Sequence, residues 1–277
     1  MANNLVPQAE RARARASNAA LPAPRGGGFP GAVSSEWSKF WTLRSTWWTL
    51  IASTLLLAAF TAVIALATRL QVQAENGQPG SVPVGSVGVS GLQLVQFAII
   101  ALAIIAVCSE YQTGSIRSTL QWVPKRGRMI VAKTTVVTVV CAATGIVFGL
   151  LGDGIAWIAL GPYRSGGVDD IVRDVFAVTV YLTSLGVFSM GLGFIIRSTA
   201  GTFAIALLAV FGLPAAFQAV DSAILNTMGQ YLPLSAGGYL IDRAVEPYGP
   251  GTAVTVLAAW AVAAVVAGGV LLKRRDA

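Results

Sequence analysis

Six apolar stretches, each close to 20 residues long, constrain the fold of this chain more than any other feature. A helix of about 20 residues spans the roughly 30 Å hydrocarbon core of a bilayer. Charged residues make up only 11% of the sequence, against about 25% in soluble proteins. The sequence therefore predicts an all-α polytopic membrane protein with six transmembrane helices. The expected spans are Trp48–Leu66, Leu92–Cys108, Thr134–Gly152, Val175–Ile196, Thr202–Val220 and Ala253–Leu272.

The third stretch is longer than a bilayer requires, because apolar residues continue past Gly152 into Ile155–Leu160. We therefore expect a break at Asp153, with Ile155–Leu160 at the outer interface. A carboxylate near membrane depth is a functional candidate. At a helix end between two glycines, however, Asp153 is expected to reach the outer water.

The basic residues are unevenly distributed among the loops, which predicts the orientation of the chain. If the N-terminus is cytoplasmic, the basic residues left outside are Arg69, Arg164, Arg173 and Arg243, out of 19 in the chain. Most acidic residues fall on the outer side instead. Both termini are therefore expected in the cytoplasm, and the net charge of +7 follows from this arrangement rather than from nucleic-acid binding. We expect no nucleic acid among the partners.

Two segments precede the first span. Residues 1–33 are rich in Arg, Ala, Gly and Pro without apolar periodicity, which predicts a disordered cytoplasmic tail. Residues 34–46 predict an amphipathic helix on the inner membrane surface, capped by Ser34 or Ser35 and with Glu36 in its first turn. Its aromatic face comprises Trp37, Phe40, Trp41 and Trp48, with Lys39 and Arg44 off that face. The alternative is an aromatic belt for the first span.

A charged segment, Ser109–Lys133, separates the second and third spans and carries the best functional signal. Glu110 ends the apolar helix, Gly114 lets the chain leave it, and Ser115 or Thr113 can cap a new short helix. In that helix Ile116, Leu120 and Val123 share one face, and Arg117 lies on the other. Pro124 then stops the helix before a basic cluster that includes Arg126. A plain cytoplasmic loop needs only the basic residues, so the amphipathic helix favours a docking element for a soluble partner.

Several chemistries are excluded by what the sequence lacks. Histidine is absent, which removes His-based metal sites and Ser/His or Cys/His nucleophile pairs. Cys108 and Cys141 lie within apolar stretches and are expected to act as small apolar residues. No GxxxxGK[ST] loop occurs, so the chain cannot hold ATP phosphates itself. We therefore expect no catalytic site, no metal site and no cofactor in this chain.

Glycine and proline mark two further positions. Gly145 and Gly149 allow close helix approach, either within the chain or in a dimer. Gly212-Leu213-Pro214 lies inside the fifth span and should kink that helix, either as a static bend or as a gating hinge. Both alternatives stay open in each case.

Three features resemble the membrane-spanning permease subunits of type-2 ABC transporters, in particular the six-span subunits of actinobacteria. They are SEWSKFWTLRSTWW before the first span, SEYQTGSIRSTL with VPKRGRMIVAK between the second and third spans, and the spacing of six spans over residues 47–272. The resemblance implies that the segment before the first span is a connecting helix. It also implies that Glu110 and Gly114 begin a coupling helix that sits in a cleft of a separate ATPase subunit. Ser115 replaces the more usual Thr, and Pro124, Arg126 and Lys133 match the proline, basic and lysine positions of the family.

What the resemblance implies for function is an exporter in the bacterial plasma (inner) membrane. Such a subunit forms its substrate pathway with a second permease copy, as a homo- or heterodimer, and ATP and Mg²⁺ bind to the partner ATPase. The resemblance also implies short re-entrant helices at the outer face within residues 221–251. The basic residues of 273–277 predict a cytoplasmic end. Two alternatives stay open, an ATP-independent secondary transporter and a non-transporting membrane regulator. The first would normally carry charges at mid-membrane, of which the spans are almost free.

Overall fold

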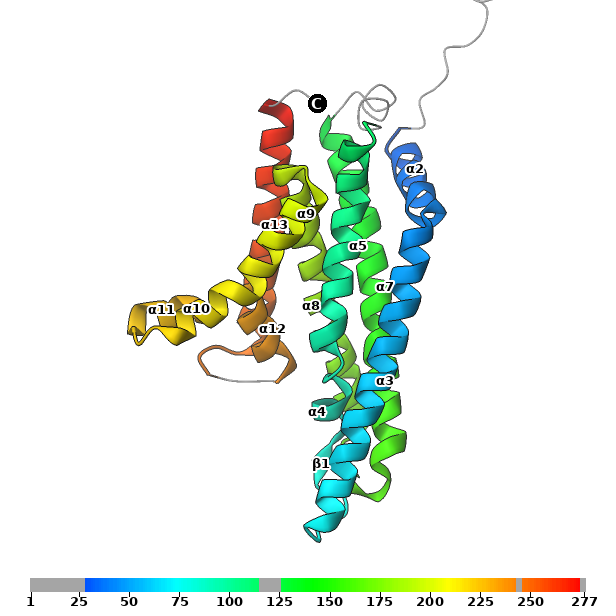
Figure 1. Ribbon diagram of the computed structural model, residues 1–277, viewed down its shortest axis with the longest axis vertical. Helices are drawn as coiled ribbons and strands as arrows, with labels where there is room; N and C mark the ends of the chain where they lie inside the picture. The colour runs from blue at the N-terminus through cyan, green and yellow to red at the C-terminus, as the bar shows by residue number, and fades with distance from the viewer. Residues whose placement is uncertain (1–27, 115–125, 243–245, 275–277) are drawn as a thin grey trace, which may run out of the picture.

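The computed structural model describes residues 28–114, 126–242 and 246–274 (Figure 1). Within these residues, six helical segments are long and apolar enough to cross a membrane, which confirms the predicted spans. They are α3 (Arg44–Ala74), α5 (Leu92–Gln112), α7 (Arg126–Leu160), α8 (Val168–Ile196), α9 (Thr199–Leu207) continued through η2 (Leu208–Gly212) and α10 (Leu213–Ala219), and α13 (Pro250–Arg274).

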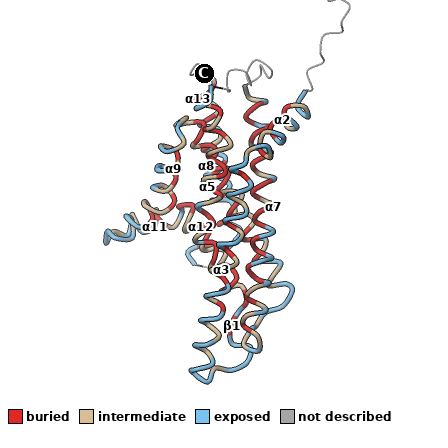
Figure 2. Tube along the Cα trace, turned by 45° about the vertical axis from the view of Figure 1, so that its right-hand side comes forward, coloured by how far each residue is buried: buried red, intermediate tan, exposed pale blue. Residues whose placement is uncertain are grey.

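The two limits of the described chain, Gly28 and Arg274, lie at the same end of the bundle, which we call the terminal end (Figure 1). The opposite end, where the strand β1 lies, we call the distal end. α8 is the central helix, and it packs on α5, α7 and α13. Leu182, Met190 and Phe194 of α8 are completely inaccessible to solvent. Burial is accordingly concentrated along the middle of the bundle (Figure 2).

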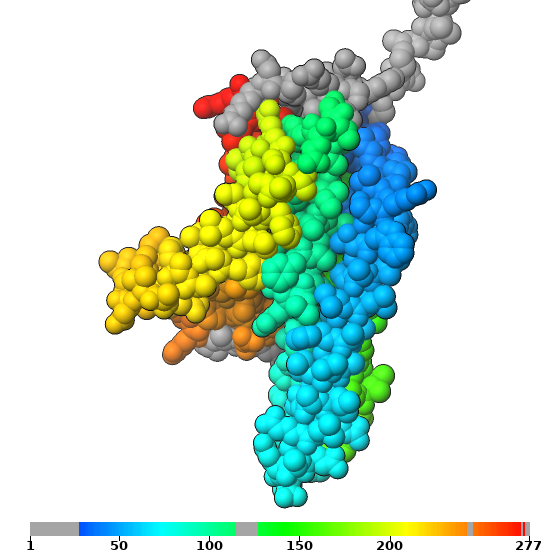
Figure 3. All heavy atoms as spheres, in the orientation of Figure 1, coloured from blue at the N-terminus to red at the C-terminus, as the bar shows by residue number. Residues whose placement is uncertain are grey.

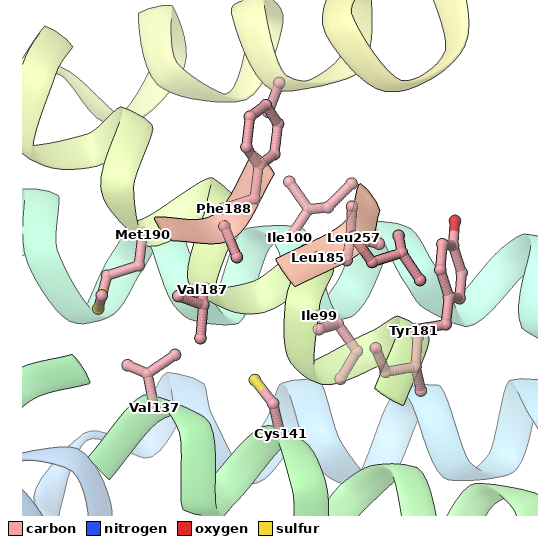
Figure 4. Packing of buried hydrophobic residues seen from close by; sticks show 14 of the residues in the cluster. Ile99, Ile100, Val137, Cys141, Tyr181, Leu185, Val187, Phe188, Met190 and Leu257 are labelled. Atoms are coloured by element: carbon pink, nitrogen blue, oxygen red, sulfur yellow. The ribbon is translucent and has the colours of Figure 1, made fainter. Parts of the chain in front are cut away.

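Close helix approach fixes α7 against α8. A Cβ atom added to Gly145 would lie 2.7 Å from the Cα atom of Thr179, and one added to Gly149 would lie 2.9 Å from the Cα atom of Val175. Both glycines therefore serve packing within the chain. Cys141 lies one turn away, and its side chain points from α7 toward α8 (Figure 4). Cys108 and Cys141 are both buried and form no disulfide.

The helices α3 and α7 extend beyond the length that a bilayer requires. Their 31 and 35 residues correspond to about 46 and 52 Å at 1.5 Å per residue. At the distal end they are covered by the short helix α4 (Val84–Gly88) and by β1 (Val82–Pro83), which pairs in parallel with β2 (Arg164–Ser165). A separate apolar cluster fills this region, built from Ala65, Val82, Val84, Val87, Ala156 and Leu160.

The predicted break at Asp153 is therefore wrong, because α7 continues through Asp153 to Leu160. Packing on α3 and α4 stabilises the part of the helix that exceeds the bilayer. The expectation that Asp153 reaches outer water is also wrong, since the residue is only 2% exposed. Its carboxylate lies against Gly88 of α4, where an added Cβ atom would be 2.2 Å from Oδ1.

The fifth span is irregular at the expected place. The N–H of Leu213 bonds to the carbonyl of Leu208, five residues earlier, so η2 is a π-helical turn directly before Pro214. Beyond it, α10 and α11 (Ala223–Gln230) project away from the bundle (Figures 1 and 3). α12 (Pro233–Ile241) then returns to pack on α13 and α8. The described residues between 221 and 242 thus form two short helices, α11 and α12, while the re-entrant course at the outer face stays a prediction.

The first helix in the described part of the chain, α2 (Gly28–Thr42), begins earlier than predicted. Residues 28–33 are helical rather than part of a disordered tail, so Ser34 and Ser35 lie inside the helix and do not cap it. Glu36 lies in its middle rather than in its first turn. The reason is tertiary packing, because Ala32, Glu36 and Phe40 form one buried face against α7. An extended residue, Leu43, separates α2 from α3.

Candidate functional site

Four charged residues meet where α2, α5 and α7 come together at the terminal end. They are Glu36 and Lys39 from α2, Glu110 from the last turn of α5 and Lys133 from the first turns of α7. Glu36, Glu110 and Lys133 are only 4%, 7% and 4% exposed. Charged residues are almost never buried to this extent unless they are paired. We call these four residues the ion-pair cluster.

Apolar packing next to the ion-pair cluster fixes the position of α2 relative to α5 and α7. Phe40 of α2 inserts between Leu102 of α5 and Val136 and Val140 of α7. Glu36 lies one turn before Phe40 on the same helix face and is therefore directed toward the same junction. The apolar contact thus determines which charges of α2 reach α5 and α7.

Lys133 is the centre of the ion-pair cluster. Its Nζ atom donates to Glu36 Oε2, to Glu110 Oε1 at 3.1 Å and to the backbone carbonyl of Ala106 at 3.1 Å. An ammonium group has three donors, so each donor of Lys133 has an acceptor. This complete pairing offsets the desolvation of a charge that is removed from water.

Lys39 closes the cluster from its solvent side. Its Nζ atom lies 2.9 Å from Glu36 Oε1 and 3.0 Å from Glu110 Oε1, and its side chain is 42% exposed. Burial opposes ionisation of the Glu36 carboxyl, yet Lys133 and Lys39 hold the pKa of Glu36 below its ordinary value. Burial likewise opposes the charge of Lys39, but Glu36 and Glu110 raise the pKa of Lys39. Both side chains are therefore charged at neutral pH.

A cavity of about 330 Å³ lies beside the cluster and is lined by all four of its charged residues. Glu110 Oε2 is buried and accepts no hydrogen bond within the part of the chain that the structure describes. The junction therefore keeps one free acceptor. Among the described residues, no group of three or more His, Cys, Asp or Glu side chains that could hold a metal ion is present.

The structure brings some of the predicted site residues together and leaves others apart. Glu110 and Lys133 are in direct contact, and Gly114 follows α5 with a φ of +71°, in the left-handed region expected for that glycine. Ser115, Arg117, Leu120 and Pro124 lie outside the described residues, and Arg126 begins α7. Gly212 and Pro214 lie in the fifth span, far along the chain from this junction.

The predicted aromatic face of α2, with Trp37, Phe40, Trp41 and Trp48 together, differs from the structure at two positions. Phe40 is buried, whereas Trp37 and Trp41 lie together at its exposed side with ring centroids 5.7 Å apart. Trp47, rather than Trp48, contacts the Trp41 ring, because the extended residue Leu43 changes the helical phase. Arg44 is exposed at the start of α3.

Sequence reasoning missed Glu36 and Lys39 as partners of Glu110 and Lys133. One signal was present, because isolated charges beside spans of such low charge content should pair with one another. No family model matches this chain, and no similar curated protein is found. Arguments about its function therefore rest on the ion-pair cluster and on the sequence motifs around it.

Proposed function

We propose that this chain is the permease subunit of an ATP-driven type-2 ABC transporter, an exporter that forms its pathway with a second permease copy. A separate ATPase subunit powers it from the cytoplasmic side. The observation that carries the proposal is the ion-pair cluster. It joins both ends of the segment 113–126, through Glu110 and Lys133, to the helix α2.

This arrangement suits the transmission of movement from a soluble partner to the membrane. A force on the segment between Gly114 and Arg126 acts on α5 and α7 together, because Lys133 holds their ends in contact. The contact of Lys133 with Glu36 carries the same force to α2, which leads directly into α3. Two discrete packings of α3, α5 and α7, biased by the nucleotide state of the ATPase, would then open and close the pathway.

The charges at the two ends of the bundle support the proposed orientation. Toward the terminal end, the described residues include the basic Lys39, Arg44, Arg128, Lys133 and Arg197 against the acidic Glu36 and Glu110. Toward the distal end, they include the acidic Glu75, Asp153, Asp169, Asp170 and Asp174 against the basic Arg69, Arg164 and Arg173. The positive-inside rule assigns the basic end to the cytoplasm. Under this assignment the segment 113–126 faces the compartment that contains ATP.

The test uses a photo-crosslinking amino acid at position 117 or 120 in the full chain, in the membranes of its own host. We expect crosslinks to a nucleotide-binding protein with a Walker A motif. The control places the same probe at Arg164 near the distal end, and it should give no such product. A further variant, Arg117→Glu, should reduce the ATPase activity that purifies with the chain without changing membrane insertion.

One observation favours a second candidate, an ATP-independent secondary transporter. Asp153 and Asp174 are buried in α7 and α8, at 2% and 5% exposure, and buried carboxylates are common in proton-coupled carriers. Transport by the purified chain in proteoliposomes under an ion gradient, lost in Asp153→Asn, would support this candidate. A chain that crosslinks to an ATPase but moves no substrate would instead be a membrane regulator.

A further inference from the structure

A cavity of about 730 Å³ opens on the side of the bundle between α8, α12 and α13. Its walls are apolar, with Val172 and Phe176 from α8, Leu240 from α12 and Val254 from α13. Val172 and Phe176 remain 61% and 56% exposed, so this side of α8 is not covered by the chain itself. In the single chain, this surface is open to the surrounding bilayer.

One end of the cavity carries a guanidinium group, whereas the carboxylates of Asp170 and Asp174 on the same helix line a different cavity beside α4. Arg173 is its sole charged lining residue within the described part of the chain, and its guanidinium makes no ion pair with any described residue. α8 and α13 both run toward the terminal end (Figure 1), so Pro250 and Gly251 in the first turn of α13 line the same, distal side of the cavity as Arg173. The N–H groups of Thr252 and Ala253 bond to Gly249, but that of Gly251 has no described backbone acceptor. A free N–H at the start of a 25-residue helix adds a partial positive charge.

The level of this charged end in the membrane follows from the helices. α13 begins at Pro250, and Arg173 lies in the second turn of α8, about 7.5 Å along the axis from its first residue. The start of a membrane span lies near the headgroup region. The apolar walls extend from that level along α8 and α13, toward the hydrocarbon core.

We propose that this cavity binds an anionic phospholipid of the surrounding bilayer. Arg173 and the N-terminus of α13 hold the headgroup phosphate, because a guanidinium presents a fork of donors that matches phosphate oxygens. One acyl chain lies along Phe176 and Val254. The site does not depend on the proposed transport function, since it uses neither the ion-pair cluster nor the segment 113–126.

Native mass spectrometry of the full chain in detergent tests the site, with phosphatidylglycerol and phosphatidylcholine titrated separately. The chain should bind phosphatidylglycerol more tightly, and Arg173→Gln should weaken that binding about tenfold, the effect of one lost charged hydrogen bond. Arg164→Gln is the matched control. Arg164 is another distal arginine, but its side chain lies over the Trp157 ring and does not line the cavity, so its removal should change nothing.

Each contrary result is informative. Equal binding of the two lipids by the unaltered chain, or equal phosphatidylglycerol binding by the Arg173→Gln and Arg164→Gln variants, would overturn the proposal. The proposal would also be overturned if millimolar inorganic phosphate displaced bound phosphatidylglycerol as effectively as added phosphatidylglycerol does. The apolar walls of the cavity would then contribute nothing to binding. Loss of phosphatidylglycerol binding in Phe176→Ala, with Arg173 intact, would support the role of the acyl chain.

Discussion

Replacing Lys133 by Met tests whether the ion-pair cluster holds the three helices together. The substitution keeps the length of the side chain but removes the ammonium that bonds to Glu36, Glu110 and the Ala106 carbonyl. Two buried carboxylates then share a single cation, Lys39, and the net charge of the cluster changes from zero to −1. Breaking a buried ion pair by removing one partner costs about 3–5 kcal/mol.

The expected loss is a large part of a typical folding free energy of about 5–15 kcal/mol. We therefore expect the unfolding midpoint of detergent-solubilised protein to fall by about 10 °C, followed through the fluorescence of its seven tryptophans. Lys39→Met is the matched control. Its ammonium is 42% exposed, so water replaces part of its pairing, and its loss should cost less than the loss of the buried Lys133 ammonium.

A double variant distinguishes lost charge pairing from lost packing. Lys133→Met with Glu110→Gln restores a net charge of zero, because Glu36 and Lys39 remain as a pair. We expect it to unfold at a higher temperature than the sum of the two single changes implies, with a coupling energy of about 2 kcal/mol. The reasoning is refuted if Lys133→Met costs no more than Lys39→Met, or if the effects of Lys133→Met and Glu110→Gln simply add.

Three further predictions use the same fluorescence assay. Gly145→Ala should destabilise the chain by about 1–3 kcal/mol, because its Cβ atom would lie 2.7 Å from the Thr179 backbone. Gly154→Ala in the same helix, with no atom within 4 Å, should not, and equal midpoints would contradict the close α7–α8 contact. Gly186→Ala should also destabilise, since its Cβ atom would lie 2.5 Å from Cys141 Sγ, and adding Cys141→Ala should recover most of the loss. A Gly186→Ala cost that is the same in both backgrounds would argue against this contact. Because the pKa of Glu36 is lowered from its ordinary value of 4.5, its stabilisation is present above that pH and is lost as the pH falls through the lower folded value. The unfolding midpoint temperature of the unaltered chain should therefore fall as the pH is lowered. In Glu36→Gln, the midpoint should fall less, because this carboxyl no longer titrates.

The transmembrane segments could be predicted from the sequence because the bilayer imposes a length on every span. The same argument failed at Asp153. Hydropathy predicts the length of a span but contains no information on tertiary contacts. The packing of Ala156 and Leu160 on α3 and α4 keeps α7 helical beyond the length of a span. The start of α2 was missed for a similar reason, since its helical residues before Ser34 are stabilised by contact with α7.

The candidate site could be predicted in part. Glu110 and Lys133 stand out in the sequence as charges beside apolar spans, and Gly114 stands out as a helix end. Their pairing with Glu36 depends on how Phe40 seats α2 between α5 and α7, which is a tertiary register that helical periodicity does not contain. The sequence predicts the position of the irregularity near Pro214 but not its type, because a π turn and a simple kink have the same sequence signal.

That π turn shifts the phase of the fifth span. A π turn contains one residue more than an α turn, so every residue after Gly212 is rotated by about 100° from where a continuous α-helix would put it. A helical wheel drawn through Thr199–Ala219 therefore assigns the wrong face to α10. Deleting one residue between Leu208 and Gly212 would restore the α-helical phase and swing α11 around the axis of the span. The direction in which α11 leaves the bundle is thus set by a single inserted residue.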